Sequence, residues 1–158
     1  MLKSTLNCAV RNCLKHQPFS FKKVDFVFQN NPLGINHGIY LVKNKYKSKD
    51  LVINLGDHFL FDMDGNKEIY NSIYKNENLI FSIKNKDVKP YGNILFSKKN
   101  NSLVKIIEKP KKKHSKFILC GLIKLSSSLT VKIKLNKKSA RGEYEWVDFI
   151  NENLNYFN

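Results

Sequence analysis

Three short stretches of the sequence place charged side chains where they could bind a phosphate or a metal ion. Leu-Val-Ile-Asn-Leu-Gly-Asp is an apolar run that ends at Asp57, and Ile-Ile-Glu-Lys-Pro ends a second run with Glu108 and Lys109. The third stretch, Ser-Ala-Arg-Gly-Glu-Tyr-Glu-Trp-Val-Asp, contains Arg141 and Asp148. Carboxylates suit Mg²⁺ or sugar hydroxyls, whereas lysine offers a phosphate a point charge and arginine a fork of donors.

Each stretch also has an ordinary structural interpretation. An aspartate after a strand is commonly part of a turn or an N-cap, and adjacent Glu108 and Lys109 are commonly a surface pair. Arg-Gly-Glu commonly begins a capped helix, and the lone tryptophan, Trp146, is interpreted as a core residue. The three stretches together, in this order, favour a phosphate and metal site.

The surrounding elements predict how these residues are positioned. Runs rich in Val, Ile, Leu and Phe are typical of buried strands, and they occur at residues 24–29, 51–57, 79–84 and 117–125. Helix-length polar segments lie at residues 38–47 and 65–76, and a Lys-Lys-Asn-Asn turn predicts a β-hairpin that ends at Pro110. This alternation predicts an α/β fold with a largely parallel sheet. Asp57 would then lie at the carboxyl end of a strand, where such sheets bind ligands.

Composition restricts the class of partner. The 158 residues carry a formal net charge of +15. The excess is lysine spread along the chain, accompanied by many asparagines, whereas recognition of phosphates and bases favours arginine. We therefore expect no nucleic-acid partner and attribute the lysines to an AT-rich coding bias. The lysine run at residues 109–116 is either a phosphate-facing patch or a solvated loop.

Cysteine content and hydropathy indicate the compartment. Three cysteines without a Cys-x-x-Cys pair disfavour a disulfide framework and a zinc site. No apolar run approaches the roughly 20 residues of a membrane helix, and the N-terminus has no signal-peptide core. We expect no membrane association and a cytoplasmic location.

Several motifs follow, in order and at similar spacing, the pattern of the sugar-1-phosphate nucleotidyltransferases. They are Gln-Asn-Asn-Pro-Leu-Gly, Leu-Gly-Asp-His-Phe-Leu-Phe-Asp, Pro-Tyr-Gly-Asn-Ile-Leu-Phe, Ile-Ile-Glu-Lys-Pro, Cys-Gly-Leu-Ile-Lys-Leu and the Ser-Ala-Arg-Gly-Glu stretch. Within this family the chain most closely resembles the glucose-1-phosphate thymidylyltransferases. The resemblance implies a Rossmann-like α/β domain at residues 24–158, with a mixed, mostly parallel sheet and helices on both faces, after a divergent segment at residues 1–23.

The resemblance also implies an activity and a set of site residues. The reaction would join dTTP, or UTP, to glucose 1-phosphate, giving dTDP-glucose and pyrophosphate, with Mg²⁺ as cofactor. The family's roles assign the phosphate to Lys109 and Arg141, Mg²⁺ to Asp57 and Asp148, the nucleobase to Gln29 and Gly34, and the sugar to Gly92, Glu108 and Gly121. Arg141 would then act as a bidentate phosphate clamp.

The sequence departs from the family pattern in ways that bear on activity. The family's triphosphate-binding loop, Gly-Gly-x-Gly-Thr-Arg-Leu, has no counterpart in these residues, and neither does its C-terminal extension. Cys120 replaces the usual Asn or Thr before glycine, and Val147 replaces the Thr before Asp148. The first hypothesis is a truncated or split enzyme that is active only if a separate chain supplies the loop, or is inactive as a remnant; a homo-oligomer is a further expected partner. A second is a non-catalytic sugar-phosphate or nucleotide-binding remnant, and a third is a basic nucleic-acid-binding domain.

Overall fold

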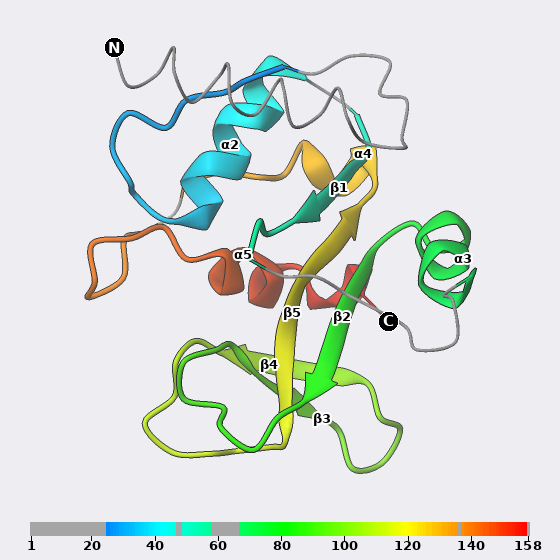
Figure 1. Ribbon diagram of the computed structural model, residues 1–158. Coiled ribbons are helices and arrows are strands. Elements are labelled where there is room, and N and C mark those ends of the chain that lie inside the picture. Colours follow the sequence, from blue (N-terminus) through cyan, green and yellow to red (C-terminus); the bar gives the residue numbers. More distant parts are fainter. Residues whose placement is uncertain (1–24, 47–48, 58–66, 136, 158) are drawn as a thin grey trace.

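A computed structural model describes residues 25–46, 49–57, 67–135 and 137–157 of the chain. The boundary expected between residues 23 and 24 therefore lies outside the described residues. Within them, one sheet contains five strands (Figure 1): β1 (Leu51–Asn54), β2 (Leu79–Lys84), β3 (Asn93–Phe96), β4 (Leu103–Ile107) and β5 (Phe117–Leu125). The predicted strands at residues 79–84 and 117–125 and the predicted hairpin are confirmed.

Strand β5 lies at the centre of the sheet and has partners along both edges. β2 pairs with residues 117–124 of β5, β1 with residues 122–125, and β3 with residues 117–118. Because a strand has only two edges, β1 and β3 must share the edge opposite β2, one beside each half of β5. β4 pairs with β3 as the second strand of the hairpin.

The strand directions differ from the expected largely parallel sheet. Every pairing among the described strands is antiparallel. β1 and β2, which are connected through α3 (Lys67–Lys75), do run in the same direction, because both are antiparallel to β5. The alternation of strands and helices predicted this shared direction, but it could not show that β5 lies between the two strands.

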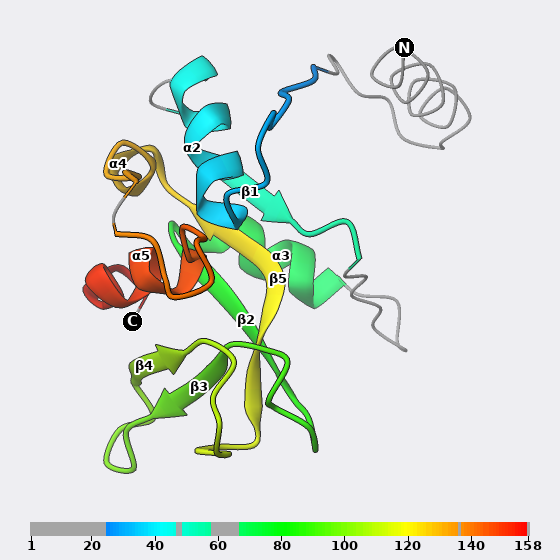
Figure 2. The same cartoon turned by 90° about the vertical axis from the view of Figure 1, so that its left-hand side faces the viewer.

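Helices cover both faces of the sheet, as expected (Figure 2). On one face, α5 (Trp146–Glu152) contributes Trp146, Phe149 and Ile150 to a core that also contains Ile123 and Leu125 of β5. On the other face, Lys124 of β5 donates from Nζ to the Ile73 carbonyl of α3 at 2.7 Å. This alternation follows from the two-residue period of a strand. The remaining helical elements are α2 (Ile35–Lys45), α4 (Ser127–Thr130) and η1 (Leu154–Tyr156).

The start of α2 differs from the expected helix at residues 38–47. Gly34 precedes it with φ +94°, a conformation that favours glycine, and Gly38 lies within the helix. The helix ends at Lys45. Lys43 and Lys45 lie in its last turn, where positive charge interacts favourably with the helix dipole. None of the described helices is long and apolar enough to cross a membrane.

The run expected as a strand at residues 24–29 forms no strand over its described residues, 25–29. The Phe26 and Phe28 rings instead stack 6.4 Å apart. Gln29 turns toward the start of α2, donating from Nε2 to the Gly34 carbonyl at 3.0 Å and lying 2.9 Å from His37 Nδ1. The strand was predicted from apolar content alone, and the local contacts of Gln29 with the start of α2 outweigh that preference.

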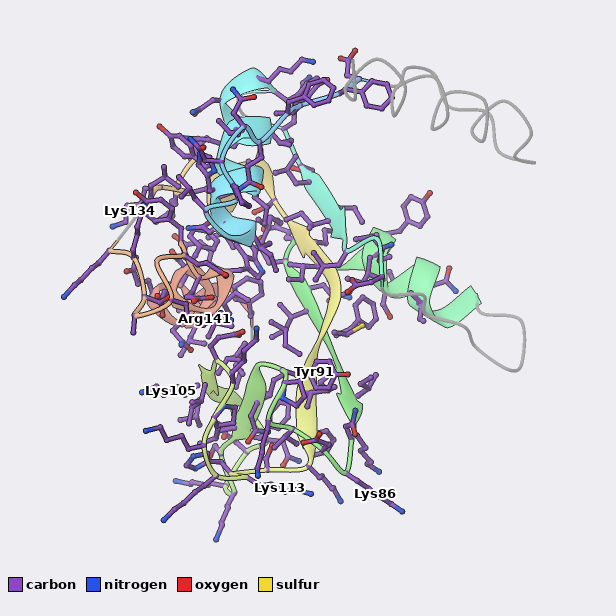
Figure 3. All side chains as sticks on the ribbon, turned by 60° about the vertical axis from the view of Figure 1, so that its left-hand side comes forward. Lys86, Tyr91, Lys105, Lys113, Lys134 and Arg141 are labelled. Atoms are coloured by element: carbon purple, nitrogen blue, oxygen red, sulfur yellow. The ribbon has the colours of Figure 1, made fainter. Side chains whose placement is uncertain are left out.

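The lysine run after Pro110 lies at the end of the molecule opposite α2. Figure 3 shows Lys86 and Lys113 there, beside the β3–β4 hairpin. Lys113 Nζ donates to the Lys86 carbonyl at 3.4 Å, and the side chains of residues 111–113 are exposed. These residues contact solvent, which favours the solvated loop over a phosphate-facing patch.

Candidate active site

A cavity of about 280 Å³ opens at the edge of β5 where β1 ends and β3 begins. Two hydrogen bonds fix this junction: Leu55 N donates to the Gly121 carbonyl at 2.9 Å, and Leu119 N donates to the Gly92 carbonyl at 2.7 Å. β1 thus ends and β3 begins beside the middle of β5, so the side chains that follow β1 and precede β3 meet there. The cavity is built by the sheet itself.

Six of the nine predicted site residues line this cavity. They are Asp57, Gly92, Glu108, Lys109, Gly121 and Arg141. Their elements are far apart in the sequence, so the convergence depends on the fold. The apolar part of the wall includes Ile53, Leu119, Ile123, Trp146 and Val147.

Gly92, just before β3, and Glu108, just after β4, are neighbours in the cavity wall. A Cβ atom on residue 92 would lie 3.4 Å from Glu108 Oε2 and 3.2 Å from Ile106 Cγ2. Gly92 is buried, and its lack of a side chain leaves space beside the carboxylate. Burial raises the pKa of Glu108 above its ordinary value, and the charge of Glu145 adds to this, while Arg141 and Lys109 oppose it.

Lys109 has a backbone conformation that is uncommon for a side-chain-bearing residue. Its φ is +41°, and its amide donates to the Tyr91 carbonyl at 3.1 Å. Non-glycine residues in this region cost free energy and persist where surrounding structure holds them, often at functional sites. The strained turn directs the chain away from β4 immediately after Glu108, at the cavity wall.

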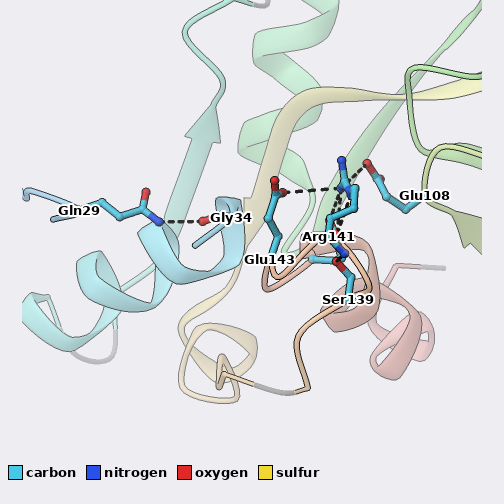
Figure 4. A network of polar contacts seen from close by, with 7 residues as sticks. Gln29, Gly34, Glu108, Ser139, Arg141 and Glu143 are labelled. Carbon is cyan, nitrogen blue, oxygen red and sulfur yellow. Dashed lines mark hydrogen bonds and ion pairs between the residues drawn. The ribbon is translucent and has the colours of Figure 1, made fainter. Parts of the chain in front are cut away.

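Arg141 is surrounded by carboxylates (Figure 4). Its Nη2 donates to Glu145 Oε1 and Oε2, both at 2.8 Å, and its Nε donates to Glu145 Oε1 at 3.3 Å. The same Nη2 lies 3.5 Å from Glu108 Oε1 and 3.6 Å from Glu143 Oε2. The hydrogen bonding of the guanidinium to the Glu145 carboxylate is the main cause of a raised Arg141 pKa. The guanidinium is therefore not the open bidentate clamp that we expected, because its fork already binds Glu145.

The loop that carries Arg141 closes on itself before α5 begins. Ser139 N donates to the Glu143 carbonyl at 2.8 Å, and Gly142 N donates to the Ser139 carbonyl at 2.9 Å. Gly142 has φ +78°, which favours glycine at this turn. Sequence analysis missed the roles of Glu143 and Glu145, although their positions two and four residues after Arg141 were a signal that could have found them.

The cavity wall carries more negative than positive charge. Among the described residues of the wall, four are acidic (Asp57, Glu108, Glu143 and Glu145) and two are cationic (Lys109 and Arg141). The wall is thus locally acidic within a chain whose net charge is +15. An anionic ligand would therefore meet Lys109 and Arg141 close to four carboxylates.

Gln29, Gly34 and Asp148 do not line the cavity. Gly34 packs against the backbone of the Arg141 loop: Tyr144 N donates to the Leu33 carbonyl at 2.8 Å, and a Cβ on residue 34 would lie 2.7 Å from the Tyr144 carbonyl oxygen. Asp148 is exposed in the first turn of α5, and desolvation with the charges of Glu145 and Glu152 raises its pKa. Within the described residues, no group of three or more His, Cys, Asp or Glu could hold a metal ion.

Comparison with known sequences identifies the family to which this fold and this cavity belong. The sequence model of the nucleotidyl transferase family matches residues 8–156, and the chain belongs to this family. The bifunctional sugar-1-phosphate nucleotidylyltransferase/acetyltransferase of Sulfurisphaera tokodaii is 35% identical over 130 residues, which are 82% of this chain and 31% of that protein. The bifunctional protein GlmU of Methanococcus maripaludis is 32% identical over 128 residues, 80% of this chain and 29% of that protein.

Solved structures agree with this assignment. A Bacillus anthracis structure described as a glucose-1-phosphate thymidylyltransferase in complex with a sucrose is 26% identical, with a TM-score of 0.65 over 84% of this chain and 54% of that one. A UDP-glucose pyrophosphorylase complexed with UDP-glucose shares the fold at 17% identity, with a TM-score of 0.71 over 97% of this chain and 60% of that one. The resemblance to the sugar-1-phosphate nucleotidyltransferases is confirmed. The chain spans less than a third of the length of the curated relatives it matches.

Proposed function

We propose that the cavity binds a sugar 1-phosphate for nucleotidyl transfer, with dTTP and glucose 1-phosphate as the substrates and dTDP-glucose and pyrophosphate as the products. One observation supports this above the others. Glu108 and Lys109 at the end of β4, and Arg141 in the loop before α5, line the same cavity. A hydroxyl acceptor and two phosphate-binding cations are the groups that a sugar 1-phosphate requires.

Each of these side chains has a distinct task in the proposed reaction. Glu108 accepts hydrogen bonds from sugar hydroxyls, while Lys109 and Arg141 orient the phosphate and balance its charge. Gly92 keeps the space beside Glu108 open for the sugar ring. In this type of reaction a sugar phosphate oxygen attacks the α-phosphorus of the nucleotide in line, so positioning and charge neutralisation account for most of the catalysis.

Mg²⁺ is the cofactor implied by the family, and the cavity fits it in part. Mg²⁺ usually takes one or two protein carboxylates and completes its shell with phosphates and water. Asp57 lines the cavity and suits this role, whereas Asp148 lies outside the cavity. When bound, the ion would neutralise phosphate charge. Asp57 is therefore the main proposed ligand, and the contribution of Asp148 stays a prediction.

The nucleotide part of the proposed site is less complete. Gln29 and Gly34, the residues proposed for the base, lie together at the start of α2, outside the cavity. No segment of the 158 residues matches the family's glycine-rich triphosphate loop. We propose that the loop needed for transfer comes from outside these 158 residues, for example from a separate chain. A homo-oligomer and a cytoplasmic location stay predictions. The alternative function is a sugar-phosphate-binding module without catalysis.

Calorimetry with glucose 1-phosphate tests the proposed site directly. Removing either cation should weaken binding about ten- to a hundredfold, because a charge-assisted contact contributes about 1.5 to 3 kcal/mol. Lys109→Ala and Arg141→Ala are the test variants. Lys112→Ala is the matched control, since Lys112 is exposed and outside the cavity. No binding at millimolar ligand, or equal losses for all three variants, would reject the site.

An assay of pyrophosphate release distinguishes the two proposed functions, the enzyme and the non-catalytic binding module. The assay combines dTTP or UTP with several sugar 1-phosphates, with and without a second chain that supplies the glycine-rich loop. We expect little turnover by the chain alone and release with dTTP and glucose 1-phosphate once the loop is present. Sugar phosphate binding without turnover under any of these conditions would favour the binding module.

A further inference from the structure

The pairing of Arg141 with Glu145 uses only part of the guanidinium. Nε and Nη2 both donate to the Glu145 carboxylate, and Nη2 also lies near Glu108 and Glu143. Among the described residues, the hydrogen bonds of the guanidinium use Nε and Nη2, and none uses Nη1. The arginine is thus held along one side and leaves one nitrogen for a ligand.

We propose that Glu145 is a positioning residue: it fixes the Arg141 guanidinium through Nε and Nη2, so that Nη1 is the donor presented to the sugar 1-phosphate. This inference rests on the proposed function, and it assigns a role to a residue outside the predicted site. Glu145 itself would not touch the ligand. Arg141 would then bind the phosphate through one nitrogen and not as a fork.

Burial distinguishes Glu145 from the other two carboxylates. Its side chain is only 10% exposed, compared with 26% for Glu108 and 41% for Glu143. It directly precedes α5 and is followed by the buried Trp146, so its backbone is held by the core. A bidentate contact to such an anchored acceptor restricts the guanidinium before any ligand binds, which lowers the ordering cost of binding.

The backbone of the loop provides a second restraint. The Ser139–Glu143 hydrogen bond closes the turn that contains Arg141, and Arg141 N lies 3.2 Å from Ser139 Oγ, to which it donates. Both the backbone and the side-chain end of Arg141 are therefore held. A guanidinium fixed at both ends can be preorganised for a phosphate, as positioning requires.

The opposing expectation is electrostatic. A carboxylate close to Arg141 repels a phosphate, so removing its charge should strengthen anion binding if charge alone matters. Glu143 provides the matched control, because its carboxylate faces the same Nη2 but makes no bidentate contact. Glu145→Gln and Glu143→Gln each remove one negative charge near the same nitrogen. Only the first replaces an acceptor oxygen of the bidentate pair with a donor.

Binding of glucose 1-phosphate is the first measurement. We expect Glu145→Gln to weaken it about tenfold, the effect of a lost charge-assisted contact, whereas Glu143→Gln should bind at least as tightly as the unmodified chain. Thermal melting of both variants confirms that they fold. Stronger binding by Glu145→Gln would overturn the proposal and show that Glu145 competes with the phosphate.

Arginine NMR is the second measurement and does not depend on the ligand. The chain has two arginines, Arg11 and Arg141, so Arg141→Lys assigns the Nε–H signal. We expect this proton of Arg141 to exchange slowly with water, to exchange faster in Glu145→Gln, and to stay slow in Glu143→Gln. An unchanged rate in Glu145→Gln would overturn the positioning role. If the unmodified chain binds no glucose 1-phosphate, the proposed function and the role toward a ligand both fail, while the exchange rates still decide whether Glu145 holds Arg141.

Discussion

Gly92 and Glu108 lie so close that a Cβ atom on residue 92 would come within 3.4 Å of the Glu108 carboxylate. Gly92→Ala should lower the free energy of unfolding by about 1 to 2 kcal/mol, because the added methyl also presses on the buried Ile106. It should also weaken glucose 1-phosphate binding, since the methyl would occupy space beside the Glu108 carboxylate. Urea unfolding and calorimetry measure the two effects. A variant with unchanged stability and affinity would show that the neighbouring side chains move aside at no cost in free energy.

Gly34 and Gly38 form a matched pair at the start of α2. Gly34→Ala should destabilise the chain by about 2 kcal/mol or more, since residue 34 has φ +94° and its new Cβ would lie 2.7 Å from a carbonyl oxygen. Gly38→Ala should instead stabilise it by about 0.5 to 1 kcal/mol, because Gly38 is inside the helix and its Cβ would make an ordinary 3.5 Å contact. Urea unfolding tests both, and similar effects of the two changes would contradict the structure.

Glu108 should make stability depend on pH. Burial raises its pKa above the ordinary 4.5, so the folded protein holds this proton more tightly than the unfolded chain does. Ionisation of Glu108 therefore lowers stability as the pH rises through the interval between 4.5 and its folded pKa, and the loss is complete above that interval. At a pH below both values the carboxyl is protonated in both states and contributes no loss.

Glu108→Gln removes this ionisation. We expect the variant to gain stability relative to the unmodified chain as the pH rises from 4 to 7, even though it binds the sugar more weakly. Urea unfolding at several pH values gives the difference. A stability gain that shrinks with rising pH would mean that Arg141 and Lys109 lower the Glu108 pKa more than burial raises it.

The two aspartates predicted for Mg²⁺ should behave differently. Asp57→Asn should abolish binding of Mg²⁺ in the presence of glucose 1-phosphate, whereas Asp148→Asn should leave it intact, because only Asp57 lines the cavity. Mn²⁺ can replace Mg²⁺ in this test, since its paramagnetism broadens the NMR signals of a ligand bound nearby. Loss of broadening in Asp148→Asn would restore Asp148 as a ligand and require α5 to contribute to the site.

The sequence predicted residues of the cavity wall better than it predicted the sheet. Glu108 and Lys109 were predicted because charged residues at the end of an apolar run are a local signal, and Arg141 was predicted from its motif. The convergence of β1 and β3 on one edge of β5 is a long-range relationship, and no run of residues encodes it locally. The expected parallel sheet was wrong for the described strands for the same reason.

Arg141 illustrates the limit of a motif. Its position in Ser-Ala-Arg-Gly-Glu predicted a phosphate contact, but the direction of its guanidinium depends on how the loop closes through Ser139 and Glu143. Asp148 shows the same limit, because its place in the motif did not show that α5 leaves it exposed and outside the cavity. Residue type is read from the sequence, whereas side-chain orientation is a property of the folded loop.

The single tryptophan of the chain lies in the cavity wall, 5% exposed and with its ring 4.9 Å from that of Phe149. Within the part of the chain that the structure describes, its buried Nε1 has no hydrogen-bond partner. An indole in such apolar surroundings emits at shorter wavelengths than one in water, and its emission responds to charges brought nearby. Trp146 is therefore a built-in optical probe: its fluorescence can follow ligand entry in real time, without a label and without another indole contributing to the signal.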